Sequence, residues 1–152
     1  MTGASERLLA SIRSYQRHRG HSGPWHLLMR KGARARHLLW SIVTQSDIDP
    51  RATLGDRLQL PHPNGVVVHE QAVIGDDCMI MQQVTVGMIG AGEVPVLGSM
   101  VYVGAGAKII GKVRVGDRAR IGANAVVTRD VPPDCTAVGV PAKIIRRDRN
   151  GR

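Results

Sequence analysis

Large aromatic side chains are almost absent from this sequence of 152 residues. It contains no phenylalanine, two tryptophans and two tyrosines. Such a chain has few side chains large enough to fill the wide interior of an ordinary globular core. Glycine, valine and isoleucine are plentiful instead, and small and β-branched residues suit narrow, repetitive packing. We therefore expect a thin, regular core in a single domain, because the chain is too short for two ordinary ones.

Cysteines and long apolar runs are also scarce. Cys78 and Cys135 are isolated and lack CxxC spacing, which indicates neither a metal site nor a disulfide framework. We expect that no metal is required and that the chain occupies a reducing, cytoplasmic setting. No apolar run approaches the ~20 residues that span a bilayer, so no transmembrane segment is expected. The Arg- and Ser-rich N-terminus lacks an apolar signal region; a transit peptide and a basic amphipathic helix pair both fit its composition.

Acidic residues are outnumbered, with 12 Asp and Glu against 21 Lys and Arg, and the net charge is +9. The excess lies at the two ends: residues 1–40 carry eight basic side chains against the single acid Glu6, and residues 143–152 form a basic tail. Such charge suits nucleic acid, a membrane or an anionic cofactor. The basic stretches lack interleaved aromatics, a recognition motif and zinc-ligand spacing, so we expect no nucleic-acid partner.

The first 45 residues carry a helical pattern. Ser5 precedes apolar residues at helical spacing from Leu8 to Tyr15, and this segment ends near Gly20. Pro24 stands where a second helix can begin, and apolar residues continue at three- and four-residue spacing as far as Ile42. We predict a helical arm over residues 1–45.

From residue 48 onward the period changes to six. Thirteen aliphatic residues recur in near-constant register, and a small or apolar residue follows most of them four positions later. This pattern predicts a three-sided coil in which each six-residue unit forms a short strand and a turn and buries its aliphatic side chain in a narrow prism. The aliphatic positions are Ile48, Leu54, Leu60, Val68, Ile74, Ile80, Val86, Leu97, Val103, Ile109, Val115, Ile121 and Val127.

The repeat is interrupted twice, by two extra residues around 64–67 and by five within 87–96. Insertions into a solenoid become surface loops, and binding and catalytic residues are often found on such loops. The β-helix domain is predicted over residues 46–142, where prolines stop the coil, and the basic tail over 143–152.

Four sequence elements carry a family resemblance: LPHPNG at 60–65, QQVTVG at 82–87, VGAGAKIIG at 103–111 and the ending VPPDCTAVGVPAKII. Together with the repeat they resemble the left-handed β-helix acyltransferases, and within them the serine O-acetyltransferase branch. The resemblance covers about residues 44–146. It implies a mainly β, left-handed parallel β-helix, acetyl-CoA as co-substrate, and a homotrimer with active sites in the grooves between subunits.

His62 is the candidate general base. Prolines flank it and Asn64-Gly65 follows, so its backbone is held in a turn. Acetyl transfer to an alcohol needs a group of near-neutral pKa to remove the hydroxyl proton, and imidazole suits that task. Asp47 lies 15 residues earlier, close to one 18-residue coil, and could orient the imidazole. The alternatives are that His62 only supports a turn and that Asp47 only caps the junction between arm and coil.

The resemblance also assigns the cofactor contacts. Gly104, Ala105, Gly106 and Ala107 match the stretch that lines the pantetheine groove, with Gly87 in the preceding coil. Lys108 and Lys143 are candidates for the cofactor phosphates. Each glycine is also a natural coil corner.

The acceptor site departs from the family. Gly92-Glu93-Val94-Pro95 stands where serine acetyltransferases carry a pattern like Asp-Arg-His-Pro, and Pro61 replaces the Asp before the catalytic His. We expect Asn64 and Glu93 beside the acceptor. L-serine is the acceptor that the family implies, a sugar or polysaccharide hydroxyl is the alternative, and a non-catalytic β-helix that binds an acidic partner through its arginines is a third reading.

Overall fold

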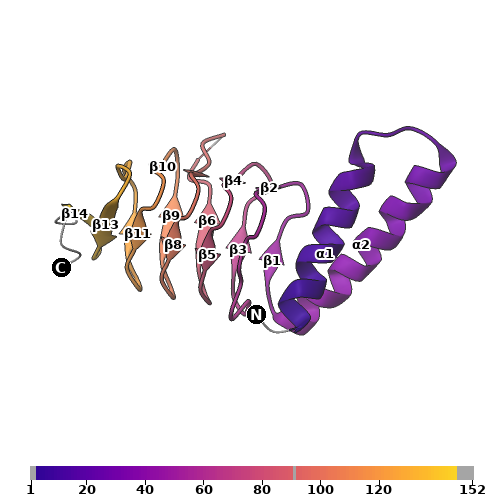
Figure 1. The fold of residues 1–152 in the computed structure, drawn as a ribbon, viewed down its shortest axis with the longest axis horizontal. Coiled ribbons are helices and arrows are strands. Elements are labelled where there is room, and N and C mark those ends of the chain that lie inside the picture. The colour runs from indigo at the N-terminus through magenta and orange to yellow at the C-terminus, as the bar shows by residue number, and fades with distance from the viewer. Residues whose placement is uncertain (1–2, 91, 147–152) are drawn as a thin grey trace.

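Two antiparallel helices precede a three-sided parallel β-solenoid in the computed structural model, which describes residues 3–90 and 92–146 (Figure 1). α1 spans Gly3–Arg19 and α2 spans Pro24–Thr44, as the apolar spacing predicts. Proline stands in the first turn of α2, where its missing N–H costs nothing. The helix ends at Gln45, whose left-handed backbone (φ 53°) forms the C-cap.

α1 closes the N-terminal end of the solenoid. Leu8 and Ile12 are fully buried and join the same apolar cluster as the solenoid core. Ser5 donates a hydrogen bond from Oγ to the carbonyl oxygen of Leu60 (2.7 Å), and Gln16 donates from Nε2 to that of Ala52 (2.8 Å). The helix therefore covers the open end of the apolar column that the first coil would otherwise expose to water.

Short strands stack into three sheets, one on each side of the prism. The pairs are parallel and in the register of a coil, such as Asp47 opposite Val67 and Val86 opposite Ile109, except that β14 runs antiparallel to β13. The first sheet contains β1 (Asp47–Ile48), β3 (Val67–Val68), β6 (Thr85–Gly87), β9 (Lys108–Ile110) and β12 (Val126–Val127). The second contains β2 (Thr53–Leu54), β4 (Val73–Ile74), β7 (Val96–Leu97) and β10 (Arg114–Val115). The third contains β5 (Met79–Ile80), β8 (Tyr102–Val103), β11 (Arg120–Ile121), β13 (Cys135–Val138) and β14 (Lys143–Arg146).

The aliphatic repeat forms the core, which confirms the prediction from its period. Of the thirteen repeat positions, twelve are buried, at 3% exposure or less, and Leu54 alone is only partly buried. Cys78 occupies an inward position, and burial raises the pKa of its thiol.

The corners of the prism require a left-handed backbone. Gln83 and Asn124 have φ values of 57° and 55°, and Gly65 and Gly106, at equivalent turns, have 68° and 73°. Glycine, asparagine and other polar residues tolerate this region best. A second column of such residues carries exposed ion pairs between neighbouring coils, from Arg57 to Asp77 (2.6 Å) and from Arg118 to Asp134 (2.7 Å).

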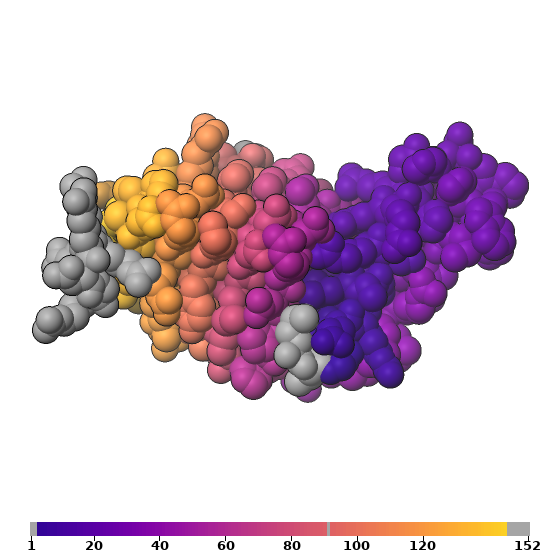
Figure 2. Space-filling view, in the orientation of Figure 1, coloured from indigo at the N-terminus to yellow at the C-terminus, as the bar shows by residue number. Residues whose placement is uncertain are grey.

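The described part of the chain contains no helix long and apolar enough to cross a bilayer. The first residues of the basic stretch, Lys143–Arg146, form β14, while residues 147–152 lie outside the described residues. Figure 2 shows the solenoid and the helical arm as one elongated body.

Candidate active site

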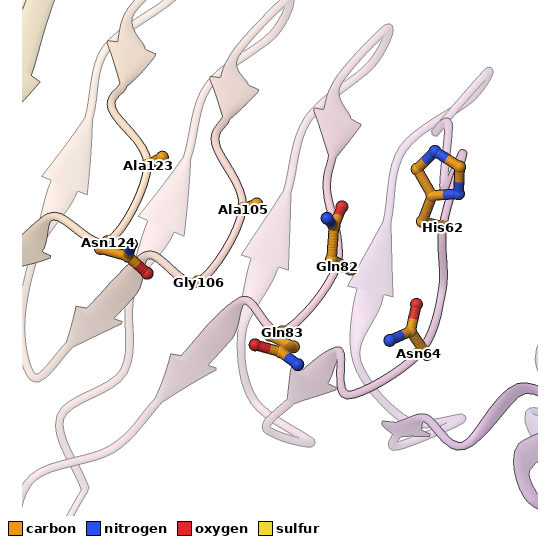
Figure 3. Close-up of a pocket in the computed structure, with 8 residues that line it drawn as sticks. All are labelled: His62, Asn64, Gln82, Gln83, Ala105, Gly106, Ala123 and Asn124. Carbon is orange, nitrogen blue, oxygen red and sulfur yellow. The ribbon is translucent and has the colours of Figure 1, made fainter.

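One corner of the prism carries a groove. The turns that lead from the third sheet into the first stack on one another and line this groove, which has a volume of about 480 Å³. Figure 3 shows the side chains in two rows, with His62, Gln82, Ala105 and Ala123 in one and Asn64, Gln83, Gly106 and Asn124 in the other. Each coil therefore contributes one residue to each row.

His62 projects from the first of these turns because that turn is longer than the others. Six residues separate Leu60 from Val67, whereas four separate Ile80 from Thr85. The extra length bulges outward while Pro63 and Val66 remain buried beneath it. Val66 donates its backbone N–H to the carbonyl oxygen of Pro63 (3.1 Å), which closes the turn. The imidazole is thus exposed on a firmly anchored backbone.

Gln82 lies next to His62 in the same row and carries an unsatisfied acceptor. Its side-chain Oε1 is buried and has no hydrogen-bond partner within the described residues. A buried amide oxygen without a partner costs free energy, so it favours a ligand that brings an N–H or O–H donor. The pantetheine arm carries two amide N–H groups, and an acceptor alcohol carries an O–H. The residues of the groove therefore fit either molecule.

The glycine-rich segment divides into two roles. Ala105 and Gly106 line the groove, whereas Ala107 is fully buried in the core and Gly104 is buried against the next coil. A Cβ at Gly104 would lie 2.7 Å from the backbone nitrogen of Ala123, so only glycine fits between these coils. Gly104 and Ala107 can therefore contact a cofactor only through their backbone atoms.

Asp47 lies on a different hollow. It begins β1 and is exposed, and together with His69 and Gly87 it lines a cavity of about 240 Å³ beside the first sheet. No hydrogen bond joins Asp47 to His62 within the described residues. In the single chain, then, the two members of the expected dyad line neighbouring surfaces and do not touch, and Gly87 lies with Asp47.

The remaining candidate residues are spread along the solenoid. Lys108 donates a hydrogen bond from Nζ to the carbonyl oxygen of Gln83 (2.6 Å), which places its ammonium group at the edge of the groove. Lys143 lines a separate hollow near the C-terminal end. Glu93 lies in the long loop after β6, outside the groove, and faces Lys112 at 3.7 Å. Asn64 is in the groove.

Four groove residues were not identified from the sequence: Gln82, Gln83, Ala123 and Asn124. The repeat could have identified two of them, because Ala123-Asn124 lies one 18-residue coil after Ala105-Gly106. The described residues hold no cluster of three or more His, Cys, Asp or Glu side chains that could bind a metal ion.

Comparison with known proteins agrees with this architecture. Residues 95–129 match the family model "Bacterial transferase hexapeptide (six repeats)". A serine acetyltransferase of Helicobacter pylori is 48% identical over 122 residues, which cover 77% of this chain and 70% of the relative. One of Mycobacterium tuberculosis is 43% identical over 127 residues, covering 79% of this chain and 56% of the relative.

Solved structures give the same result. A serine acetyltransferase in complex with CoA superposes with a TM-score of 0.73 and 38% identity, over 89% of this chain and 55% of that one. One in complex with cysteine gives a TM-score of 0.76 and 37% identity, over 92% and 55%.

The three-sided coil, the groove at its corner and the repeat define a parallel β-helix of the hexapeptide-repeat class. Within that class, the chain belongs to the serine acetyltransferase family. It spans about half the length of several of the curated relatives that it matches.

Proposed function

We propose that the chain is an acetyl-CoA-dependent O-acetyltransferase in which His62 activates the acceptor hydroxyl. The observation that carries the proposal is the exposed imidazole at one end of a groove of about 480 Å³ lined by small residues and by the unpaired amide oxygen of Gln82. Family membership supports acetyl-CoA as the donor, and a relative has been solved in complex with CoA.

The thioester supplies an activated acetyl group, and the protein supplies position and proton transfer. Ala105, Gly106 and Ala123 leave room for a narrow chain to lie along the corner, with Gln82 as an acceptor for one of its amides. Lys108 at the edge and Lys143 further along the solenoid are the candidates for the phosphates. His62 takes the hydroxyl proton as the oxygen attacks, the C–O bond forms as the C–S bond breaks, and the imidazolium returns its proton to the departing thiolate.

Asp47 remains our candidate to orient His62, with Asn64 beside the acceptor. In the single chain the groove is open on one side, which supports a homotrimer in which a second copy covers it. We place the enzyme in the cytoplasm, the reducing setting that its two free cysteines favour.

L-serine is the acceptor that the family supports, and one relative has been solved in complex with serine. One observation favours a neutral sugar or glycan hydroxyl as the second candidate. Pro61, next to His62, offers no side-chain partner for the charged groups of a free amino acid. A desolvated zwitterion needs such partners, whereas a sugar hydroxyl does not.

The test is thiol release from acetyl-CoA with L-serine and with a panel of sugars and glycans, measured side by side. Turnover of serine with saturation at submillimolar concentration would establish the serine activity. Turnover confined to a sugar would establish the second candidate. An absence of acceptor-dependent thiol release across the panel would favour the non-catalytic reading, in which the arginines bind an acidic partner.

A further inference from the structure

The outer face of α2 carries an apolar stripe that stays largely exposed within the described residues. Its members form two groups, at 27–28 and 38–42, which the helical period places on one side of the helix. They are exposed by 45–67%. The members of this outer stripe are Leu27, Leu28, Leu38, Leu39 and Ile42, with Trp25 beside them at 64% exposure.

The opposite side of α2 is the one that faces α1. Ala33 is completely buried there, and Trp40 is partly buried with the guanidinium of Arg7 over its ring at 5.1 Å. Figure 1 shows α2 as the outer helix of the pair, extending beyond the end of the solenoid. Most of the outer stripe therefore lies clear of α1 and the β-helix, and only Leu38 lines a hollow together with Asp47 and Pro50 of the first coil.

Basic residues accompany the outer stripe. Lys31 and Arg34 are exposed on α2 at positions that lie within the stripe or at its edge in the helical register. Neither forms an ion pair with an acid among the described residues, and Arg36 donates only to the hydroxyl of Ser14 (3.0 Å). Glu6 is the only acid in residues 1–45. An apolar stripe, a flanking tryptophan and basic side chains are the features of helices that lie in a membrane interface.

We propose that the outer face of α2 is a docking surface for an anionic phospholipid membrane, on which the helix lies parallel to the bilayer plane. The apolar stripe enters the boundary between headgroups and acyl chains, and Trp25 sits at headgroup level. Lys31 and Arg34 extend their apolar stems along the surface and pair with lipid phosphates. The β-helix and its groove then stand close to the bilayer, in reach of an acceptor or partner held there.

A second copy of the arm is the competing occupant, and the charge distribution argues against it. Residues 1–45 carry eight basic side chains and one acid, so two arms that pack stripe to stripe would bring like charges together without compensation. Anionic headgroups supply the missing negative charge, at about 1 kcal/mol for each Lys or Arg near the surface. The outer stripe and the surrounding charge are thus complementary to the same partner.

The experiment is co-sedimentation of the full chain with vesicles of phosphatidylcholine, with and without about one quarter of phosphatidylglycerol. Leu28→Gln/Leu39→Gln removes part of the outer stripe, and Lys31→Gln/Arg34→Gln removes charge beside it. The matched controls are Met100→Gln/Ile145→Gln, at exposed apolar positions on the β-helix, and Lys112→Gln/Arg129→Gln. Sedimentation velocity without vesicles records the native assembly of every variant.

We expect binding to the anionic vesicles only. The charge variant should bind roughly 30-fold more weakly, from two contacts of about 1 kcal/mol each. The stripe variant should lose at least roughly tenfold, because a buried leucine contributes about 1.5–3 kcal/mol. The control variants should stay within about twofold of the unmodified chain. Failure to bind anionic vesicles, or unchanged binding by the stripe variant, would overturn the proposal. A loss of native assembly size in the stripe variant alone would instead assign the surface to contact between copies.

Discussion

Two glycines that lie two residues apart in the sequence should respond differently to the same added methyl group. Gly104 and Gly106 both belong to the glycine-rich segment, but the structure gives them different neighbours. A Cβ at Gly104 would lie 2.7 Å from the backbone nitrogen of Ala123 and 2.9 Å from the carbonyl carbon of Gly122. A Cβ at Gly106 would instead meet the side chain of Asn124. The first contact is with backbone of the next coil, and the second is with an exposed side chain that can turn away.

The expected magnitudes follow from what has to move. Gly104→Ala forces two stacked coils apart, and overpacking of this kind costs about 1–3 kcal/mol. We expect the upper end of that range, because the hydrogen bond from Gly104 to the carbonyl oxygen of Ile121 (2.8 Å) must lengthen too. Gly106→Ala puts alanine at a φ of 73°, which costs roughly 1–2 kcal/mol. Its methyl group also narrows the groove.

The assay is urea unfolding at equal protein concentration, combined with the KM for acetyl-CoA. Gly104→Ala should lower the unfolding midpoint most and leave the KM of the folded fraction nearly unchanged. Gly106→Ala should lower the midpoint less and raise the KM. The added change Asn124→Gly should recover part of the lost stability, because it removes the clashing side chain and glycine tolerates the φ of 55° at this position. Equal loss of stability in the two variants, or no recovery in the double variant, would refute this assignment of roles.

Three further outcomes are expected. Gln82→Leu should raise the KM for acetyl-CoA or acceptor about three- to tenfold, the contribution of one hydrogen bond, with an unfolding midpoint that is unchanged or higher because the unpaired oxygen is gone; an unchanged KM would remove Gln82 from the site. Ile109→Ala should cost about 2–5 kcal/mol in urea unfolding, since the side chain is completely buried; a loss below 1 kcal/mol would contradict the packing of the column. Burial lowers the pKa of His18 below its ordinary 6.5, with His26 and other nearby positive charges adding to the effect. The folded state thus binds fewer protons than the unfolded one, so the free energy of unfolding should fall as the pH drops through about 6.5. The difference in unfolding temperature between about pH 8 and about pH 5 should be smaller in His18→Gln than in the unmodified chain. An equal difference would contradict this prediction.

The six-residue period of the sequence predicted the fold of the solenoid. Inward positions such as Val103 and Ile109 recur every six residues because each coil must bury one aliphatic side chain on each face, so the pattern specifies the prism directly. Helix spacing likewise predicted α1 and α2. Spacing within the chain did not reveal that α1 covers the end of the solenoid, because that contact joins Ser5 to Leu60 across 55 residues.

The site was predictable only in part. The two extra residues in the turn at 61–66 indicated His62, because a bulge on a regular solenoid exposes its side chain. Gln82 was not predicted because its role depends on a buried side-chain oxygen without a hydrogen-bond partner, and a residue pattern does not show such an atom. The sequence spacing also predicted that Asp47 lies close to His62, since 15 residues is nearly one coil. In the structure Asp47 pairs with Val67 in the first sheet, whereas His62 lies in the turn before that strand.

The central claim is that His62 removes the proton from the acceptor hydroxyl, and turnover of His62→Ala with acetyl-CoA and the preferred acceptor tests it most directly. Because the imidazole is exposed and its turn is held by Pro63 and Val66, the variant should keep its unfolding midpoint and its affinity for CoA. Its kcat should fall by a factor on the order of 10² to 10⁴, the usual contribution of a general base. Full activity in a folded His62→Ala protein would contradict the account.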